Sequence, residues 1–87
     1  MSIEDIAKIA HESYRAYCSV NKVNPEAVWE DLPAFTRTGA INGVTLALQF
    51  PDMPLPVSLS AEQRIRAELF NSVAKTLLPY RALTEQL

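Results

Sequence analysis

Several features that mark common functional classes are scarce in this chain of 87 residues. The one cysteine, Cys18, excludes an internal disulfide and has no neighbours spaced as metal ligands. The 8 basic residues are scattered among 10 acidic ones, for a net charge of −2, so no positive stripe fits a nucleic-acid backbone. No apolar run approaches the length of a membrane span. We therefore expect a cytoplasmic protein that binds no metal, nucleic acid or membrane.

The length leaves room for one domain, over residues 1–87. Its apolar content of 48% and charged content of 21% are typical of a folded protein rather than a disordered one. A domain this small has a thin core, and association with further copies is a common supplement to such a core. We expect a homo-oligomer.

The first segment with helical spacing begins at Ser2 and fades near Val20. Ser2 is placed as an N-cap, and Asp5 stands where it completes a capping box. The expected apolar stripe of this helix comprises Ile3, Ile6, Ala7, Ala10, Tyr14 and Tyr17.

A second helix is expected from Pro33 to about Phe50. Before it, Asn24 and Pro25 favour a short capped helical turn, since proline fits the first helical position. The apolar face of the second helix is predicted to comprise Phe35, Ile41, Val44 and Leu48. Gly39 and Gly43 lie four residues apart inside it, and each costs about 1 kcal/mol relative to alanine. Their shared side indicates that another backbone, or a ligand, comes close there.

A loop rich in proline, PDMPLPVSLS, precedes the last helix. Ser60 is expected to cap that helix with Gln63 in the reciprocal position, and Pro79 is expected to end or kink it. Arg64 and Arg66 are assigned to its solvated side. The expected apolar stripe is Ala61, Ile65, Leu69, Val73 and Leu77, with Phe70 and Ala74 beside it. No segment alternates like a strand, so the predicted fold is all-α, a compact bundle of three main helices.

The stretch HESYRAYC, from His11 to Cys18, concentrates polar and aromatic side chains on one helix. His11 and Cys18 lie about 10 Å apart along the helix axis, too far for a nucleophile and its base, and no catalytic motif occurs. One interpretation is core packing, with His11 and Arg15 half-solvated. The other is a rim of donors beside an aromatic wall, with Trp29 as a stacking partner for a flat anionic ligand. Arg37 and Asn42 leave the same choice open.

Three segments of the chain resemble the RyR domain, the small module named after ryanodine receptors. They are IAKIAHESYRAYC, WEDLPAFTRTGAINGV and LSAEQRIRAELFNSVAKTL. Matching pattern positions are Arg15, Tyr17, Cys18, Trp29, Pro33, Ala40, Ile41, Gly43, Val44, Leu69, Phe70 and Val73. The chain departs from the pattern at Tyr14, where the family usually has asparagine. It also has QFPDMPLPVS in place of a long insertion before the last helix.

The resemblance implies a non-catalytic binding module without a cofactor. Prokaryotic RyR-like domains look like parts of antiviral systems that sense nucleotide-derived messengers. A free-standing copy, encoded by a phage, would act in the host cytoplasm by sequestering such a messenger. In this hypothesis Arg15 pairs with a phosphate, His11 adds a donor, and Trp29 or Tyr14 stacks on the base. The alternative is a protein-interaction module that docks a partner through Phe50, Met53 and Leu55.

Overall fold

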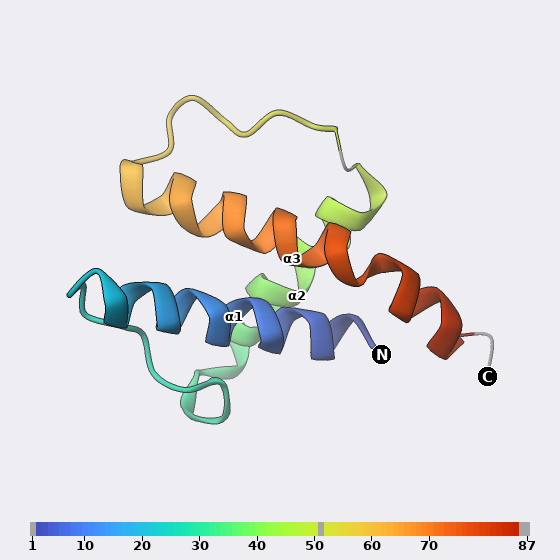
Figure 1. Ribbon diagram of the computed structural model, residues 1–87, viewed down its shortest axis with the longest axis horizontal. Coiled ribbons are helices and arrows are strands. Elements are labelled where there is room, and N and C mark those ends of the chain that lie inside the picture. Colours follow the sequence, from blue (N-terminus) through green and yellow to red (C-terminus); the bar gives the residue numbers. More distant parts are fainter. Residues whose placement is uncertain (1, 51, 86–87) are drawn as a thin grey trace.

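The structure, a computed structural model, describes residues 2–50 and 52–85, with side chains described up to residue 77. It consists of α1 (Ile3–Val20), a short 3-10 turn η1 (Trp29–Asp31), α2 (Ala34–Gln49) and α3 (Ala61–Glu85). Figure 1 shows α1 and α3 as antiparallel neighbours with α2 crossing behind them. Each helix packs against the other two, and the described residues form no strand. The predicted all-α bundle of three helices is confirmed.

Both predicted capping boxes are present. The Asp5 N–H donates to Ser2 Oγ at 3.1 Å, and the Ser2 N–H donates back to Asp5 Oδ2 at 3.0 Å. At the start of α3, Gln63 and Ser60 make the same reciprocal pair at 3.2 and 2.9 Å. These side chains pair backbone groups that the first helical turn leaves without partners, so each box fixes where its helix begins.

The core lies where the three helices meet. Small side chains dominate it, and alanines at the contacts let helix axes approach closely. Its members are Ile6, Ala7, Ala10, Tyr14 and Cys18 from α1, Trp29 and Leu32 from the connection, Ala40, Val44 and Ala47 from α2, and Phe70 and Ala74 from α3. In α1 the predicted stripe is confirmed at its centre, while Ile3 and Tyr17 are only partly buried.

The predicted short helical turn at Asn24 and Pro25 is wrong. Residues 23–28 form no helix, and the turn begins only at Trp29. Lys22 adopts a positive φ of 58°, which ends α1 and turns the chain back beside it. The carbonyls of Glu26 and Ala27 then accept hydrogen bonds from α1 side chains. Because α1 supplies these partners, the segment is held without helical hydrogen bonds of its own.

The predicted face of α2 is wrong at Phe35, whose side chain is 80% exposed. Phe35 precedes the fully buried Val44 by nine residues. At about 100° per residue, nine residues place the two side chains on opposite sides of the helix. The buried side of α2 belongs instead to Ala40, Val44 and Ala47, flanked by the partly buried Ile41 and Leu48.

The buried face of α3 is displaced by about one residue from the face that the sequence predicts. Phe70 and Ala74 are its buried centre, whereas Leu69, Val73 and Leu77 are only partly buried and Ala61 is exposed. The helix also continues past position 79, where proline was expected to end or kink it, and reaches Glu85. The loop of residues 52–60 arches outside α3 in Figure 1, without helical structure, as its prolines predict.

Candidate functional site

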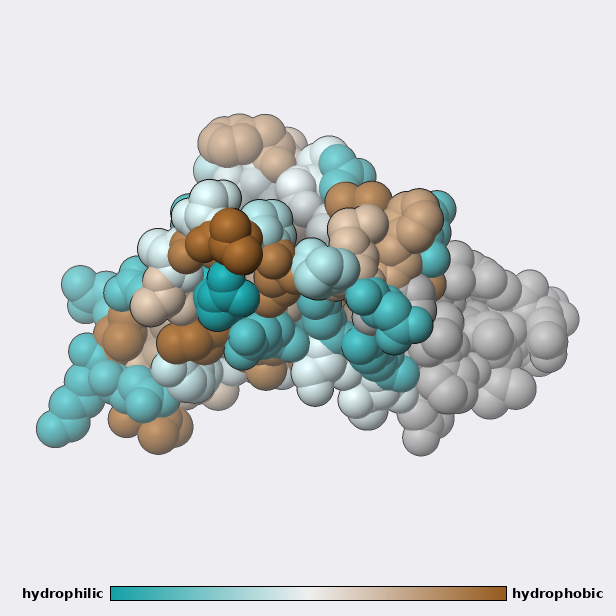
Figure 2. Space-filling view, turned by 90° about the horizontal axis from the view of Figure 1, so that it is seen from above, coloured by the Kyte–Doolittle hydropathy of each residue, from teal (hydrophilic) through white to brown (hydrophobic). Residues whose placement is uncertain are grey.

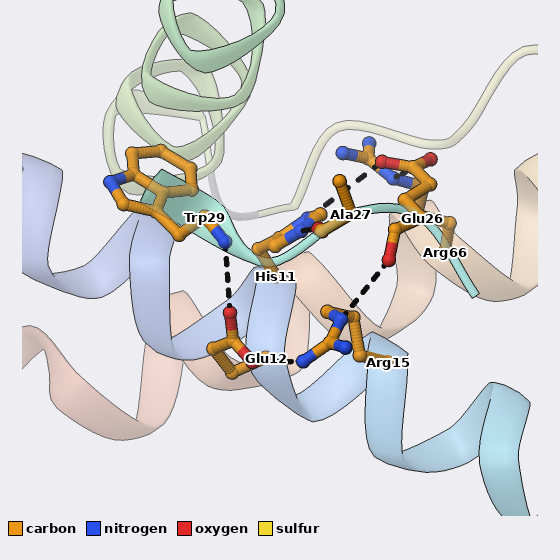
Figure 3. A network of polar contacts seen from close by, with 7 residues as sticks. All are labelled: His11, Glu12, Arg15, Glu26, Ala27, Trp29 and Arg66. Atoms are coloured by element: carbon orange, nitrogen blue, oxygen red, sulfur yellow. Dashed lines mark hydrogen bonds and ion pairs between the residues drawn. The ribbon is translucent and has the colours of Figure 1, made fainter. Parts of the chain in front are cut away.

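His11 is a core residue, not a half-solvated one as its position in the sequence suggested. Its side chain is fully buried, and Nε2 lies 2.7 Å from the carbonyl oxygen of Ala27 (Figure 3). A carbonyl can only accept, so Nε2 carries the proton. The imidazole centroid lies 5.9 Å from that of Trp29, which is also buried. The two rings therefore fasten the connection between α1 and α2 to the core.

Glu12 joins the same connection to α1 through two hydrogen bonds. Its Oε1 accepts from the backbone N–H of Trp29 at 3.1 Å, and its Oε2 accepts from Arg15 Nη1 at 2.9 Å. Arg15 also donates through Nε to the Glu26 carbonyl at 3.1 Å, as Figure 3 shows. The hydrogen bond from Arg15, followed by that from Trp29, lowers the pKa of Glu12 below its usual 4.5. Both partners stabilise the charged carboxylate.

The lowered pKa of Glu12 predicts a loss of stability in acid. A group whose pKa is depressed by folding stabilises the fold above its unfolded pKa, and this contribution disappears as pH falls through the folded value. We expect the urea midpoint of the wild-type chain to fall as pH drops below 4.5. Glu12→Gln should start from a lower midpoint at neutral pH and lose less on acidification. Parallel curves for the two proteins would contradict this assignment.

Arg66 is the charged residue whose role the sequence did not reveal. It was assigned to the solvated side of α3, but its guanidinium carbon lies 4.3 Å from the centroid of Phe70 and 5.9 Å from that of Tyr14. Its Nε also lies 3.7 Å from Glu26 Oε1, and the side chain is only partly exposed. The i,i+4 spacing of Arg66 and Phe70 was the available signal, because these positions are neighbours on a helix.

The structure brings together four of the six residues predicted for a site. His11, Tyr14 and Arg15 lie on α1, and Trp29 lies beside His11, but three of the four are buried and Arg15 is held by Glu12 and the Glu26 carbonyl. Arg37 and Asn42 lie on a different helix, α2. The α1 group is therefore a packed network in the structure rather than an open binding surface.

An open groove lies elsewhere, between α2, α3 and the loop. It has a volume of about 240 Å³ and is lined mainly by apolar side chains. Phe50, Met53, Pro54, Leu55 and Pro56 form its outer wall, Phe70 and Ala67 lie on α3, and Arg66 and Asn71 supply its polar groups. Figure 2 views the molecule from the loop side, where apolar surface is exposed among hydrophilic side chains.

Gly39 and Gly43 line this groove along α2. A Cβ added to either glycine would meet no atom within 4 Å, and neither has a positive φ. The expected approach of another backbone is therefore absent within the chain. At these two positions no side chain covers the helix backbone on the groove side. Of the two interpretations drawn from the sequence, close approach of a ligand is the one that fits.

The described part of the chain offers neither a metal site nor a membrane span. No three residues of the metal-binding types gather there as a cation site, and no helix there is long and apolar enough to cross a membrane. No family model, curated protein or solved structure matches this chain.

Proposed function

We propose that this chain is a non-catalytic binding protein that takes a small, flat, anionic ligand in the groove between α2, α3 and the loop. The observation that carries the proposal is the groove itself, in which apolar walls, a bare helix backbone and an arginine come together. Small-molecule sites combine mostly apolar linings with a few polar groups that fix orientation. The α1 network offers comparable chemistry, but its side chains are engaged with one another.

Each part of the groove corresponds to one part of such a ligand. The missing Cβ atoms of Gly39 and Gly43 allow a planar ring to approach the α2 backbone. Phe50, at the rim, supplies an aromatic face for stacking. Arg66 lies 3.7 Å from Glu26 through Nε but makes no hydrogen bond through that atom, and it supplies the positive charge that a phosphate requires. A volume of about 240 Å³ suits one base or sugar-phosphate unit lying partly in solvent.

The resemblance to the RyR domain supports the ligand class. It points to a nucleotide-derived messenger, and the protein would act as a sponge or sensor module for it. The sequence placed the phosphate-binding role on Arg15 and the stacking role on Trp29 or Tyr14. Because the structure holds these side chains in packed positions, the proposal transfers the two roles to Arg66 and Phe50.

The test compares two arginines in one assay. A panel of cyclic di- and oligonucleotides and ADP-ribose derivatives is screened by thermal shift and native mass spectrometry. We expect Arg66→Gln to weaken binding of any hit by about tenfold or more, since a charge-assisted pair is lost. Arg15→Gln, the matched control in the α1 network, should bind normally. Loss of binding only in Arg15→Gln would place the ligand at α1 instead.

A second candidate function is protein docking. Phe50, Met53 and Val57 are exposed on the loop side, and Val57 is 94% exposed. Exposed apolar side chains gathered on one face often mark interaction sites. A chain that binds no nucleotide of the panel, and whose partner binding is lost on replacing Phe50 and Met53 with serine, would favour this function over the first.

A further inference from the structure

The carboxylate of Glu26 lies beside two buried nitrogen atoms. Its Oε1 is 3.7 Å from Arg66 Nε, and its Oε2 is 3.8 Å from His11 Nδ1 (Figure 3). Both distances exceed the length of a hydrogen bond, and neither nitrogen has a hydrogen-bond partner within the described part of the chain. A carboxylate only accepts, so it could bond to Nδ1 only if that atom also carried a proton. Glu26 is therefore close to both nitrogens without being bonded to either.

The backbone of Glu26 is fixed, whereas its side chain can turn. The Glu26 carbonyl accepts from Arg15 Nε at 3.1 Å, and the next carbonyl, that of Ala27, accepts from His11 Nε2 at 2.7 Å. The Glu26 side chain is 42% exposed, so its carboxylate already reaches water. Rotation about the side-chain bonds can therefore carry the carboxylate away from Arg66 while the chain around it stays in place.

Arg66 connects Glu26 with the groove. It lines the groove beside Phe70, and its guanidinium carbon lies 4.3 Å from the centroid of that ring. Stacking on an aromatic face holds the guanidinium in one plane and leaves its edges available to acceptors. Glu26 does not line the groove, so it approaches Arg66 from outside it. A negative group in the groove and the Glu26 carboxylate would therefore share one positive charge.

The two interactions with Arg66 would differ in strength. A partly exposed ion pair without a hydrogen bond contributes little, because water screens it. A phosphate that accepts hydrogen bonds from the guanidinium interacts more strongly, since it can use two oxygens at once. Such a ligand can displace Glu26, although the attraction that Arg66 loses reduces the affinity. An uncharged occupant of the groove would gain nothing from the displacement.

We propose that Glu26 sets the specificity of the groove by competing with the anionic group of the ligand for Arg66. In the free protein Glu26 partly neutralises Arg66, and on binding its carboxylate turns toward solvent. The groove then favours groups that bind a guanidinium more strongly than a loosely held carboxylate does, and phosphate is such a group. This inference rests on the proposed function and adds the residue that tunes it.

The test measures how tightly inorganic phosphate binds at Arg66. Phosphate is titrated at constant ionic strength, and the NMR signal of the Arg66 Nε–H group reports its binding. We expect Glu26→Gln, which keeps the shape and removes the charge, to bind phosphate about two- to fivefold more tightly than the wild-type chain. The matched control is Glu68→Gln, which makes the same change in net charge at an exposed position of α3 and should bind like wild type. Glu26→Asp keeps the charge and should also stay near the wild-type affinity.

The outcomes separate this inference from the proposed function. Equal or weaker phosphate binding by Glu26→Gln, or no response of Arg66 in either protein, would overturn the inference. If the nucleotide panel binds through Arg66 while Glu26→Gln behaves like wild type, the inference fails and the proposed function stands. If Glu26→Gln binds phosphate more tightly but neither protein binds any nucleotide of the panel, the proposed ligand class fails and the competition between Glu26 and an anion stands. Equal gains in Glu26→Gln and Glu68→Gln would show an effect of net charge alone, and would also overturn the inference.

Discussion

Replacing Trp29 by alanine is expected to lower the free energy of unfolding by about 3–5 kcal/mol. The indole is almost fully buried, on the three-residue turn between α1 and α2. Its ring packs near His11, and its backbone N–H is held by Glu12. Removing the ring would leave a cavity at the point where the connection meets the core. In a domain of marginal stability, a loss of this size approaches unfolding.

Urea denaturation followed by circular dichroism at a helix wavelength measures this effect, since the variant has no tryptophan left to report fluorescence. Phe35→Ala is the control, because it also removes a large aromatic ring but from an exposed position. In dilute solution it should change stability by no more than about 0.5 kcal/mol. A stable Trp29→Ala protein that has lost nucleotide binding would instead support Trp29 as a stacking platform, the role suggested by the sequence.

His11→Ala is expected to cost about 2–4 kcal/mol, for two separate reasons. It empties a fully buried position, and it removes the hydrogen bond that Nε2 donates to the Ala27 carbonyl at 2.7 Å. That carbonyl belongs to a segment without regular structure. No helical N–H is therefore available to replace the donor that the carbonyl loses. The same urea experiment reads the effect.

His11→Gln separates the two contributions. The glutamine amide nitrogen can reach the position of Nε2 and still donate to Ala27, so this variant should recover part of the loss. If glutamine and alanine destabilise the fold equally, the hydrogen bond is not what holds residues 23–28 in place. A fully stable His11→Ala protein would return His11 to the role of a solvent-facing ligand donor.

The secondary structure was largely readable from local signals. Ser2 with Asp5, and Ser60 with Gln63, pair within four residues of one another, so no knowledge of the rest of the fold is needed to recognise them. The proline-rich loop is equally local. Pro79 shows the limit, because one of its two expected effects, the end of α3, is contradicted by a helix that continues to Glu85.

The site was less predictable because it depends on contacts between distant segments. His11 reads as a surface residue until residues 26 and 27 return beside it, 15 and 16 positions later in the chain, and cover its ring. Arg66 reads as solvated until Glu26 and Tyr14 approach it from other elements. The face of α2 was misjudged for a related reason. Its buried residues are small, so the larger Phe35 outweighed Ala40 and Ala47 in the apolar pattern.

Gly39 and Gly43 line the groove, and each costs an exposed helix about 1 kcal/mol relative to alanine. A Cβ at either position would meet no atom within 4 Å, so the packing of the fold does not require the glycines. The chain therefore keeps α2 less stable than its own contacts demand. A version of α2 stabilised by alanine at both positions would have less open space beside the loop, so stability and room in the groove are exchanged at the same two residues.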